Sequence, residues 1–317
     1  MKFGLLSYSK SRNFGDQIQS LAARQYLPEV NQFLDRDFLN EYTGDPIKLI
    51  MNGWFMAKPE NWPPSDKIKV LLTSFHITHD YNAKEKMFSP QAMEFYKRNQ
   101  PIGCRDYYTL ELLESYGIEA FYSGCLTLTL PNIYKSLPKT DDIYMVDVLY
   151  KVGGKRREWL DKVRKKWLLK KIFPGTILQN AIHVQQTVPP KTPEDDKFNL
   201  AEEMLKKYAT AKLVITSRIH CALPCIALGT PVLFIDGGLE HPTDQTRLKG
   251  ITEYMNAYNI DDVNKEYKGF FNALTTKSKF DNPLNIDWDN PPQNPENHLE
   301  VAKKLKKSCE NFINDQN

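Results

Sequence analysis

The segment KLVITSRIHCALPCIALGTPVLFID, residues 212–236, carries the densest structural pattern in the chain. Residues 213–215 and 231–235 are short apolar runs rich in β-branched side chains, which is typical of strands buried on both faces of a parallel sheet. Residues 221–228 between them are small and apolar and are followed by Gly229, which predicts a buried helix with a glycine stop. Pro224 fits only in the first turn of that helix. The segment therefore predicts a strand, helix, strand unit of an α/β fold.

Polar side chains gather where the first of these strands ends, at residues 216–220. In an open parallel sheet, ligands bind beyond the carboxyl ends of the strands, beside the N-terminus of the next helix. We expect Arg218 and His220, two apart in an extended segment, to project to one side and to form an anion site with a titratable group beside it. The alternative is structural, with Arg218 in a surface ion pair and His220 as a helix cap.

Two other predicted strands end in residues of the same kind. Arg105 follows the apolar run 101–104 and opens a helix that Asp106 caps, so Arg105 could reach the same cleft as Arg218. His76 lies at the end of the run 70–77. The pattern predicts several functional groups on one edge of the fold.

The composition is that of an ordinary globular protein of one or two domains. The chain has 317 residues, of which 41% are hydrophobic and 26% charged, and a net charge of +3 that gives no reason to expect a nucleic-acid partner. No apolar run has the length of a membrane span or a signal peptide, so we expect a cytoplasmic protein. The five cysteines are odd in number and lie in apolar patterns without a Cys-x-x-Cys pair, which favours buried thiols and no metal site.

Three segments resemble one known family. TSRIHCALPCIALGTPV resembles the C-terminal signature of the polysaccharide pyruvyltransferases, NFGDQIQSLAARQYLP their opening Asn-x-Gly-Asp helix, and IGCRDYYTLELLESYGIEAFYSGCLTLTLP their central segment. The segments come in the family's order and span most of the chain, from about residue 2 to about residue 251. The resemblance implies a pyruvyl group transferred from phosphoenolpyruvate to a sugar as a ketal, with phosphoenolpyruvate as donor substrate and no cofactor.

The resemblance also implies a fold similar to the glycosyltransferase-B architecture, an α/β protein with two Rossmann-like lobes facing a cleft. We expect residues 1–135 to form an N-terminal lobe on the acceptor side and residues 136–295 a C-terminal lobe on the donor side. Residues 296–317 are expected to form a helix that returns to the first lobe.

The family resemblance associates Arg218, His220 and Arg105 with phosphoenolpyruvate, and the chemistry and position of the residues indicate further roles. His220 is expected to be the general acid that protonates the enol methylene carbon, and Arg218, Arg105 and Ser217 to bind the donor. The acceptor sugar, of a surface or exopolysaccharide precursor, is expected to be bound by Asn13, Asp16, Gln17 and His76. For Asp16 a helix cap is the structural alternative.

Segment 156–170 is strongly basic and carries Trp159 and Trp167 on one side of a predicted helix. Such a helix could lie on the anionic inner face of a membrane, which would suit a lipid-linked acceptor, or pack on the sheet with a solvated basic face. Two other functions remain open on sequence alone. One is a glycosyltransferase that uses a nucleotide sugar, and the other is a non-catalytic sugar-binding protein of polysaccharide assembly.

Overall fold

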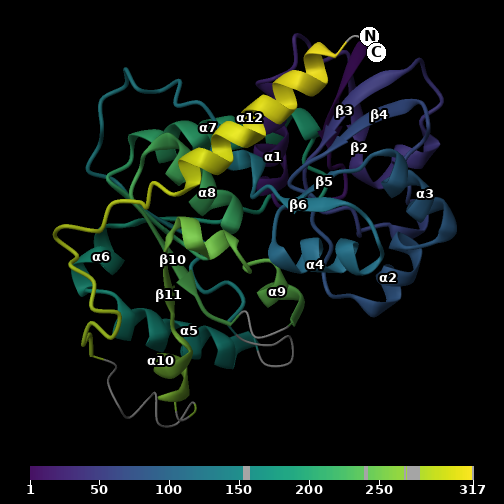
Figure 1. Ribbon diagram of the computed structural model, residues 1–317. Coiled ribbons are helices and arrows are strands. Elements are labelled where there is room, and N and C mark those ends of the chain that lie inside the picture. Colours follow the sequence, from purple (N-terminus) through teal and green to yellow (C-terminus); the bar gives the residue numbers. More distant parts are fainter. Residues whose placement is uncertain (153–157, 239–241, 268, 270–278, 316–317) are drawn as a thin grey trace.

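The computed structural model describes residues 1–152, 158–238, 242–267, 269 and 279–315, which contain two larger parallel sheets and a short two-stranded one (Figure 1). The first sheet has the strand order β2-β1-β3-β4, and every pair in it is parallel. Its strands are β1 (Lys2–Ser7), β2 (Gln32–Asp35), β3 (Ile47–Met51) and β4 (Ile68–Leu72).

A short parallel pair, β5 (Ile102–Cys104) and β6 (Ala120–Tyr122), extends this lobe. The chain beyond β4 joins the pair to the sheet, because Phe75 N donates to Gly103 O at 2.9 Å and Arg105 N donates to Phe75 O at 2.9 Å. The helices of this lobe are α1 (Gly15–Arg24), α2 (Tyr81–Met87), α3 (Pro90–Arg98) and α4 (Tyr107–Ser115), with 3-10 turns η1 (Arg36–Glu41), η2 (Pro59–Asn61) and η3 (Leu126–Thr129).

The second sheet has the order β11-β10-β9-β7-β8 and is also parallel throughout. Its strands are β7 (Ile143–Val146), β8 (Ile182–Val184), β9 (Leu213–Thr216), β10 (Val232–Asp236) and β11 (Asn256–Asn259). The helices are α5 (Glu158–Ile172), α6 (Gly175–Asn180), α7 (Glu194–Thr210), α8 (Ile219–Leu228), α9 (Pro242–Thr246) and α10 (Asp261–Lys265), with the 3-10 turn η4 (Ile251–Tyr254). The predicted class, two Rossmann-like α/β lobes facing a cleft, is confirmed by the two parallel sheets with their flanking helices.

The predicted strand, helix, strand unit is present as β9, α8 and β10. All of β9 is buried, and Gly229 ends α8 with a left-handed φ of 74°. The regular part of α8 begins after a kink at His220, so Pro224 lies near its start and is tolerated there. α7 begins at Glu194, directly after Pro193. Acidic residues in the first turn favour this start because they lie at the positive end of the helix dipole.

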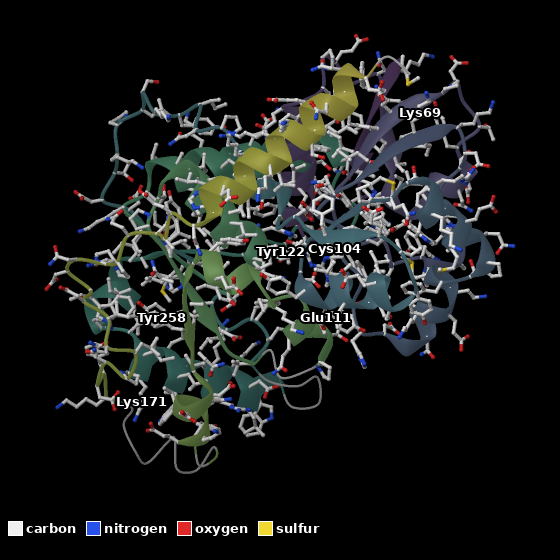
Figure 2. All side chains as sticks on the ribbon, in the orientation of Figure 1. Lys69, Cys104, Glu111, Tyr122, Lys171 and Tyr258 are labelled. Carbon is white, nitrogen blue, oxygen red and sulfur yellow. The ribbon has the colours of Figure 1, made fainter. Side chains whose placement is uncertain are left out.

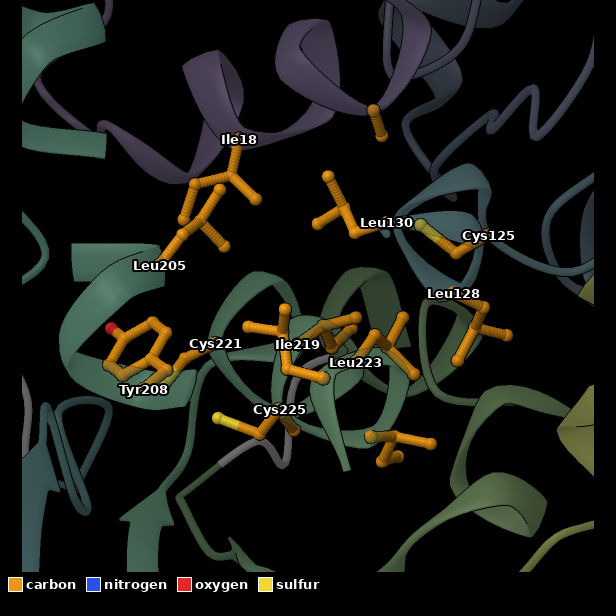
Figure 3. Packing of buried hydrophobic residues seen from close by; sticks show 14 of the residues in the cluster. Ile18, Cys125, Leu128, Leu130, Leu205, Tyr208, Ile219, Cys221, Leu223 and Cys225 are labelled. Atoms are coloured by element: carbon orange, nitrogen blue, oxygen red, sulfur yellow. The ribbon is translucent and has the colours of Figure 1, made fainter. Parts of the chain in front are cut away.

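A shared hydrophobic core joins the two lobes. Ile18 of α1 packs near Leu130, which follows η3, and near Leu205 of α7 and Ile219 and Leu223 of α8 (Figure 3). The core therefore holds the first helix of one lobe against two helices of the other.

The last helix, α12 (His298–Asn314), crosses from the second lobe to the first and ends beside β3 (Figure 1). At its end, Lys48 Nζ of β3 donates to Phe312 O at 2.7 Å and to Ile313 O at 3.3 Å. Glu111 of α4, labelled in Figure 2, makes a second contact between the lobes by accepting from Lys249 Nζ at 2.7 Å.

The basic segment 156–170 falls largely on α5, while residues 156 and 157 lie outside the described part of the chain. Leu168 is buried, whereas the Trp159 side chain is 57% exposed. Membrane contact through this segment stays a prediction. Among the described residues, no helix combines the length and the apolar character that a bilayer span requires.

Candidate functional site

A cavity of about 520 Å³ lies between the two lobes. Its walls come from segments that follow the carboxyl ends of β1, β2, β3, β4, β5, β7, β9 and β10, which is where ligands bind in open parallel sheets. The lining residues are Lys10, Ser11, Asn13, Asp16, Gln19, Arg36, Asp37, Trp54, Ala57, Lys58, His76, Thr78, Arg105, Lys151, His220, Thr243, Asp244 and Arg247. The site is rich in cations and also contains two histidines.

Arg105 is the most unusual of these residues, because its side chain is buried and its charge is incompletely paired. The residue is 1% exposed, and Nε lies 3.8 Å from the nearest oxygen of Asp106. Among the described residues, neither Nε nor the terminal nitrogen Nη2 has a hydrogen-bond partner. Burying an underpaired cation costs free energy, so an Arg held in this way indicates a site for an anionic ligand.

His76 and Asp106 form a buried pair beside Arg105. His76 Nδ1 lies 2.5 Å from Asp106 Oδ2, and both side chains are fully buried. Burial, with the nearby positive charge of Arg105, lowers the pKa of His76 to about 4. Burial alone would raise the pKa of Asp106, but His76 and Arg105 outweigh it and the pKa is lowered. The pair therefore holds an ionised carboxylate and a neutral imidazole near pH 7.

His220 reaches the same cavity from the second lobe. It is 6% exposed, and its Nε2 has no hydrogen-bond partner in the ranges that the structure describes. Burial lowers the pKa of His220 well below its usual value, and Arg105, Arg247 and His76 add to the effect. His220 is therefore neutral in the free protein, and a bound anion would favour its protonated form.

A side-chain hydrogen bond to the His220 carbonyl replaces the helical hydrogen bond that Pro224 cannot donate. Proline has no N–H, so the His220 carbonyl lacks its usual partner four residues on. Gln186 Nε2, which follows β8, donates to that carbonyl instead at 3.0 Å. The kink at His220 is thus stabilised by the segment that follows β8.

Arg218 and Ser217 are more engaged than the sequence suggested. Arg218 Nε lies 2.8 Å from Asp147 Oδ2, and the guanidinium lies 3.6 Å from the centre of the Tyr150 ring. The expectation that Arg218 and His220 share an extended segment is wrong, because α8 begins at Ile219. Both residues nevertheless line one smaller adjoining cavity.

The Ser217 hydroxyl forms hydrogen bonds with the backbone of two other segments. It donates to Ile235 O at 2.6 Å and accepts from Leu149 N at 2.9 Å. Ser217 also lines the smaller cavity. Donor binding by Arg218 and Ser217 stays a prediction.

The predicted acceptor residues divide into two groups. Asn13, Asp16 and His76 line the large cavity, whereas Gln17 does not. The Gln17 side chain is buried on another face of α1, where Nε2 donates to Glu194 Oε1 at 2.8 Å. Gln19 lines the cavity instead. Asp16 makes no cap bond in α1 and accepts from the Ser11 hydroxyl at 2.6 Å.

Comparison with known protein families identifies the family of this chain. The family model described as polysaccharide pyruvyl transferase matches residues 13–238. The chain belongs to the polysaccharide pyruvyl transferase family. The matched region begins at Asn13 and contains Arg105, His76 and His220, so the resemblance seen in the three sequence segments is confirmed.

Several solved structures are distantly similar to this family member. A protein of uncharacterized function from Klebsiella pneumoniae aligns with 82% of this chain and 92% of its own, at 15% identity and a TM-score of 0.44. UDP-GlcNAc 2-epimerase from Methanocaldococcus jannaschii, in complex with UDP-GlcNAc and UDP, covers 97% of this chain and 99% of its own at 12% identity and a TM-score of 0.43. No curated protein sequence matches the chain. We draw no functional conclusion from these likenesses.

Sequence reasoning missed several cavity residues of this pyruvyl transferase family member. Arg247 follows β10 and Lys151 follows β7, and both lie near Asp244, at 4.0 Å and 3.1 Å. Their position after the carboxyl ends of parallel strands is the signal that could have found them. Within the described part of the chain, no group of three His, Cys, Asp or Glu side chains could hold a metal ion.

Proposed function

We propose that this protein transfers the pyruvyl group of phosphoenolpyruvate to two hydroxyls of a sugar in a surface polysaccharide precursor, releasing phosphate. The observation that carries the proposal is the buried, underpaired guanidinium of Arg105 in the cavity between the lobes. Membership of the polysaccharide pyruvyl transferase family supports the same reaction.

The cavity has the charge that a small, highly anionic donor requires. Phosphoenolpyruvate carries a phosphate and a carboxylate on a three-carbon unit, and planar guanidinium groups bind both by paired hydrogen bonds. Arg105, Arg247 and Lys151 line the same cavity. Arg105 Nε and Nη2 have no acceptor among the residues that the structure describes, so an anion could bind there without breaking one of the described hydrogen bonds.

His220 fits the role of general acid once the donor is bound. The anion offsets the surrounding positive charge, which raises the pKa of His220 and places a proton where the enol methylene carbon would lie. Protonation at that carbon makes C2 electrophilic. C2 then gains two C–O bonds to the sugar and loses its bond to the phosphate oxygen. Of the two hydroxyl protons, one balances the proton on the methyl carbon and the other leaves with phosphate.

Donor selectivity can be tested by the melting temperature of the purified protein. Saturating phosphoenolpyruvate should raise it, since a ligand at one hundred times its Kd stabilises the native state by about 2.7 kcal/mol. UDP-sugars and ADP-sugars should leave the melting temperature unchanged. A rise with a nucleotide sugar alone would contradict the proposal in favour of a glycosyltransferase, and no rise with any of these ligands would favour a non-catalytic sugar-binding protein.

A further inference from the structure

Asp106 makes more contacts than a helix cap requires. Its Oδ1 accepts from Thr109 N and from the Thr109 hydroxyl, both at 2.9 Å, as expected of the cap of α4. Its other oxygen, Oδ2, lies 2.5 Å from His76 Nδ1. The carboxylate is therefore fixed by the helix and in turn fixes the plane of the His76 ring.

The ionisation states of Asp106 and His76 determine which ring nitrogen of His76 carries the proton. An ionised carboxylate only accepts, so the neutral His76 ring carries its proton on Nδ1 and donates it to Asp106. His76 Nε2 then carries a buried lone pair that has no partner within the described part of the chain, on a residue that lines the cavity. A neutral imidazole oriented by a carboxylate has the arrangement of a general base.

The wall beside His76 is suited to a sugar ring. Trp54 pairs with His76 in a parallel bridge, with His76 N donating to Gly53 O at 3.0 Å. The half-buried Trp54 ring lines the same cavity, and its Nε1 donates to the Thr78 hydroxyl at 3.2 Å. A pyranose stacked on Trp54 would therefore have hydroxyls within reach of His76.

We propose that His76 is the general base that removes the proton from the acceptor hydroxyl that attacks first, and that Asp106 is its positioning residue. The inference rests on the proposed function. The hydroxyl oxygen forms its bond to C2 as its proton moves to His76 Nε2. His220 gives its proton to the methylene carbon and regains one from the second hydroxyl. The proton on His76 leaves with phosphate as the C2–O bond to phosphate breaks, so both histidines return to their starting states.

The placement of the two histidines supports this division of roles. His76 comes from the first lobe and His220 from the second, and both line the cavity with Arg105. Arg105 and Asp106 are adjacent in sequence, so one strand-to-helix junction would hold the donor and also orient the base.

The kinetic test compares His76→Gln and Asp106→Asn with the control His183→Gln, which changes an exposed histidine of β8. Phosphoenolpyruvate and methyl hexopyranosides with free 4- and 6-hydroxyls serve as probes. Turnover in His76→Gln should fall about 10²- to 10⁴-fold while Kd for phosphoenolpyruvate stays within about threefold. Imidazole should restore part of the turnover of His76→Ala. Near-normal turnover in His76→Gln would overturn the inference and leave the proposed function intact.

A second measurement needs no acceptor. In protein labelled with ¹⁵N-histidine, the His76 signals at pH 7 should show a protonated Nδ1 and an unprotonated Nε2, and Asp106→Asn should change that pattern. A His76 with its proton on Nε2, or charged at pH 7, cannot act as the base and would overturn the inference. Failure of the wild-type protein to bind phosphoenolpyruvate would instead contradict the proposed function, whatever the state of His76.

Discussion

Replacing Arg105 by methionine should abolish donor binding while leaving the unliganded protein at least as stable as the wild type. Arg105 is buried and underpaired, so in the free protein its charge costs more than it contributes. With donor bound, two charge-assisted hydrogen bonds at about 1.5–3 kcal/mol each correspond to a Kd weaker by about 10²- to 10⁴-fold in the variant. Titration calorimetry with phosphoenolpyruvate and the melting temperature without ligand measure the two effects.

The matched control is Arg98→Met, in which an exposed arginine paired with Asp66 is changed in the same lobe. We expect it to bind the donor as the wild type does. Unchanged donor affinity in Arg105→Met would remove Arg105 from the site. A large loss of stability in the same variant would show that the guanidinium is structural.

His220→Gln should lose turnover by about 10²- to 10⁴-fold and bind phosphoenolpyruvate with an affinity close to that of the wild type. The reason is that His220 supplies a proton, whereas the cationic residues supply most of the attraction for the donor. Because the pKa of His220 is well below its usual value in the free protein, donor binding near pH 7 should be accompanied by proton uptake. Calorimetry in buffers of different ionisation enthalpy measures that uptake directly.

The control for this variant is again His183→Gln, which should keep both turnover and proton uptake. Turnover near that of the wild type in His220→Gln would show that another group protonates the methylene carbon. Proton uptake that persists in the variant would assign the titration to another residue.

Local patterns predicted the framework of the site. The apolar runs of β9 and β10 and the glycine at the end of α8 follow from strand burial and helix termination, and the family resemblance pointed to Arg105 and His220. Position after the carboxyl end of a parallel strand is a local property of the sequence. These residues could therefore be found without the fold.

Contacts between distant residues could not be predicted in this way. The sequence does not show that Asp147 pairs with Arg218 from 71 residues away, or that Asp106 holds His76 from 30 residues away. The first contact places Arg218 in an ion pair, although its sequence position predicted an anion-binding role. The second makes Asp106 a partner of His76 as well as the cap of α4. Which arginine is left underpaired depends on the tertiary fold.

The difference between Gln17 and Gln19 follows from the geometry of α1. Residues three apart share a helix face, so Asp16 and Gln19 both line the cavity, and Gln19 Nε2 donates to Asp16 Oδ1 at 3.3 Å. Gln17 points elsewhere and meets Glu194 of α7. The helical period applied to Asp16 would have favoured Gln19 over Gln17.

The central claim is that C2 of phosphoenolpyruvate becomes the ketal carbon of a sugar. The most direct measurement is ¹³C NMR of phosphoenolpyruvate labelled at C2, incubated with the protein and the methyl hexopyranoside panel. We expect the enol carbon signal to be replaced by a ketal carbon signal as phosphate is released in equal amount, and Arg105→Met to show neither change. Bound phosphoenolpyruvate whose C2 signal stays that of the enol with every acceptor, or appears only as free pyruvate, would contradict the proposed transfer.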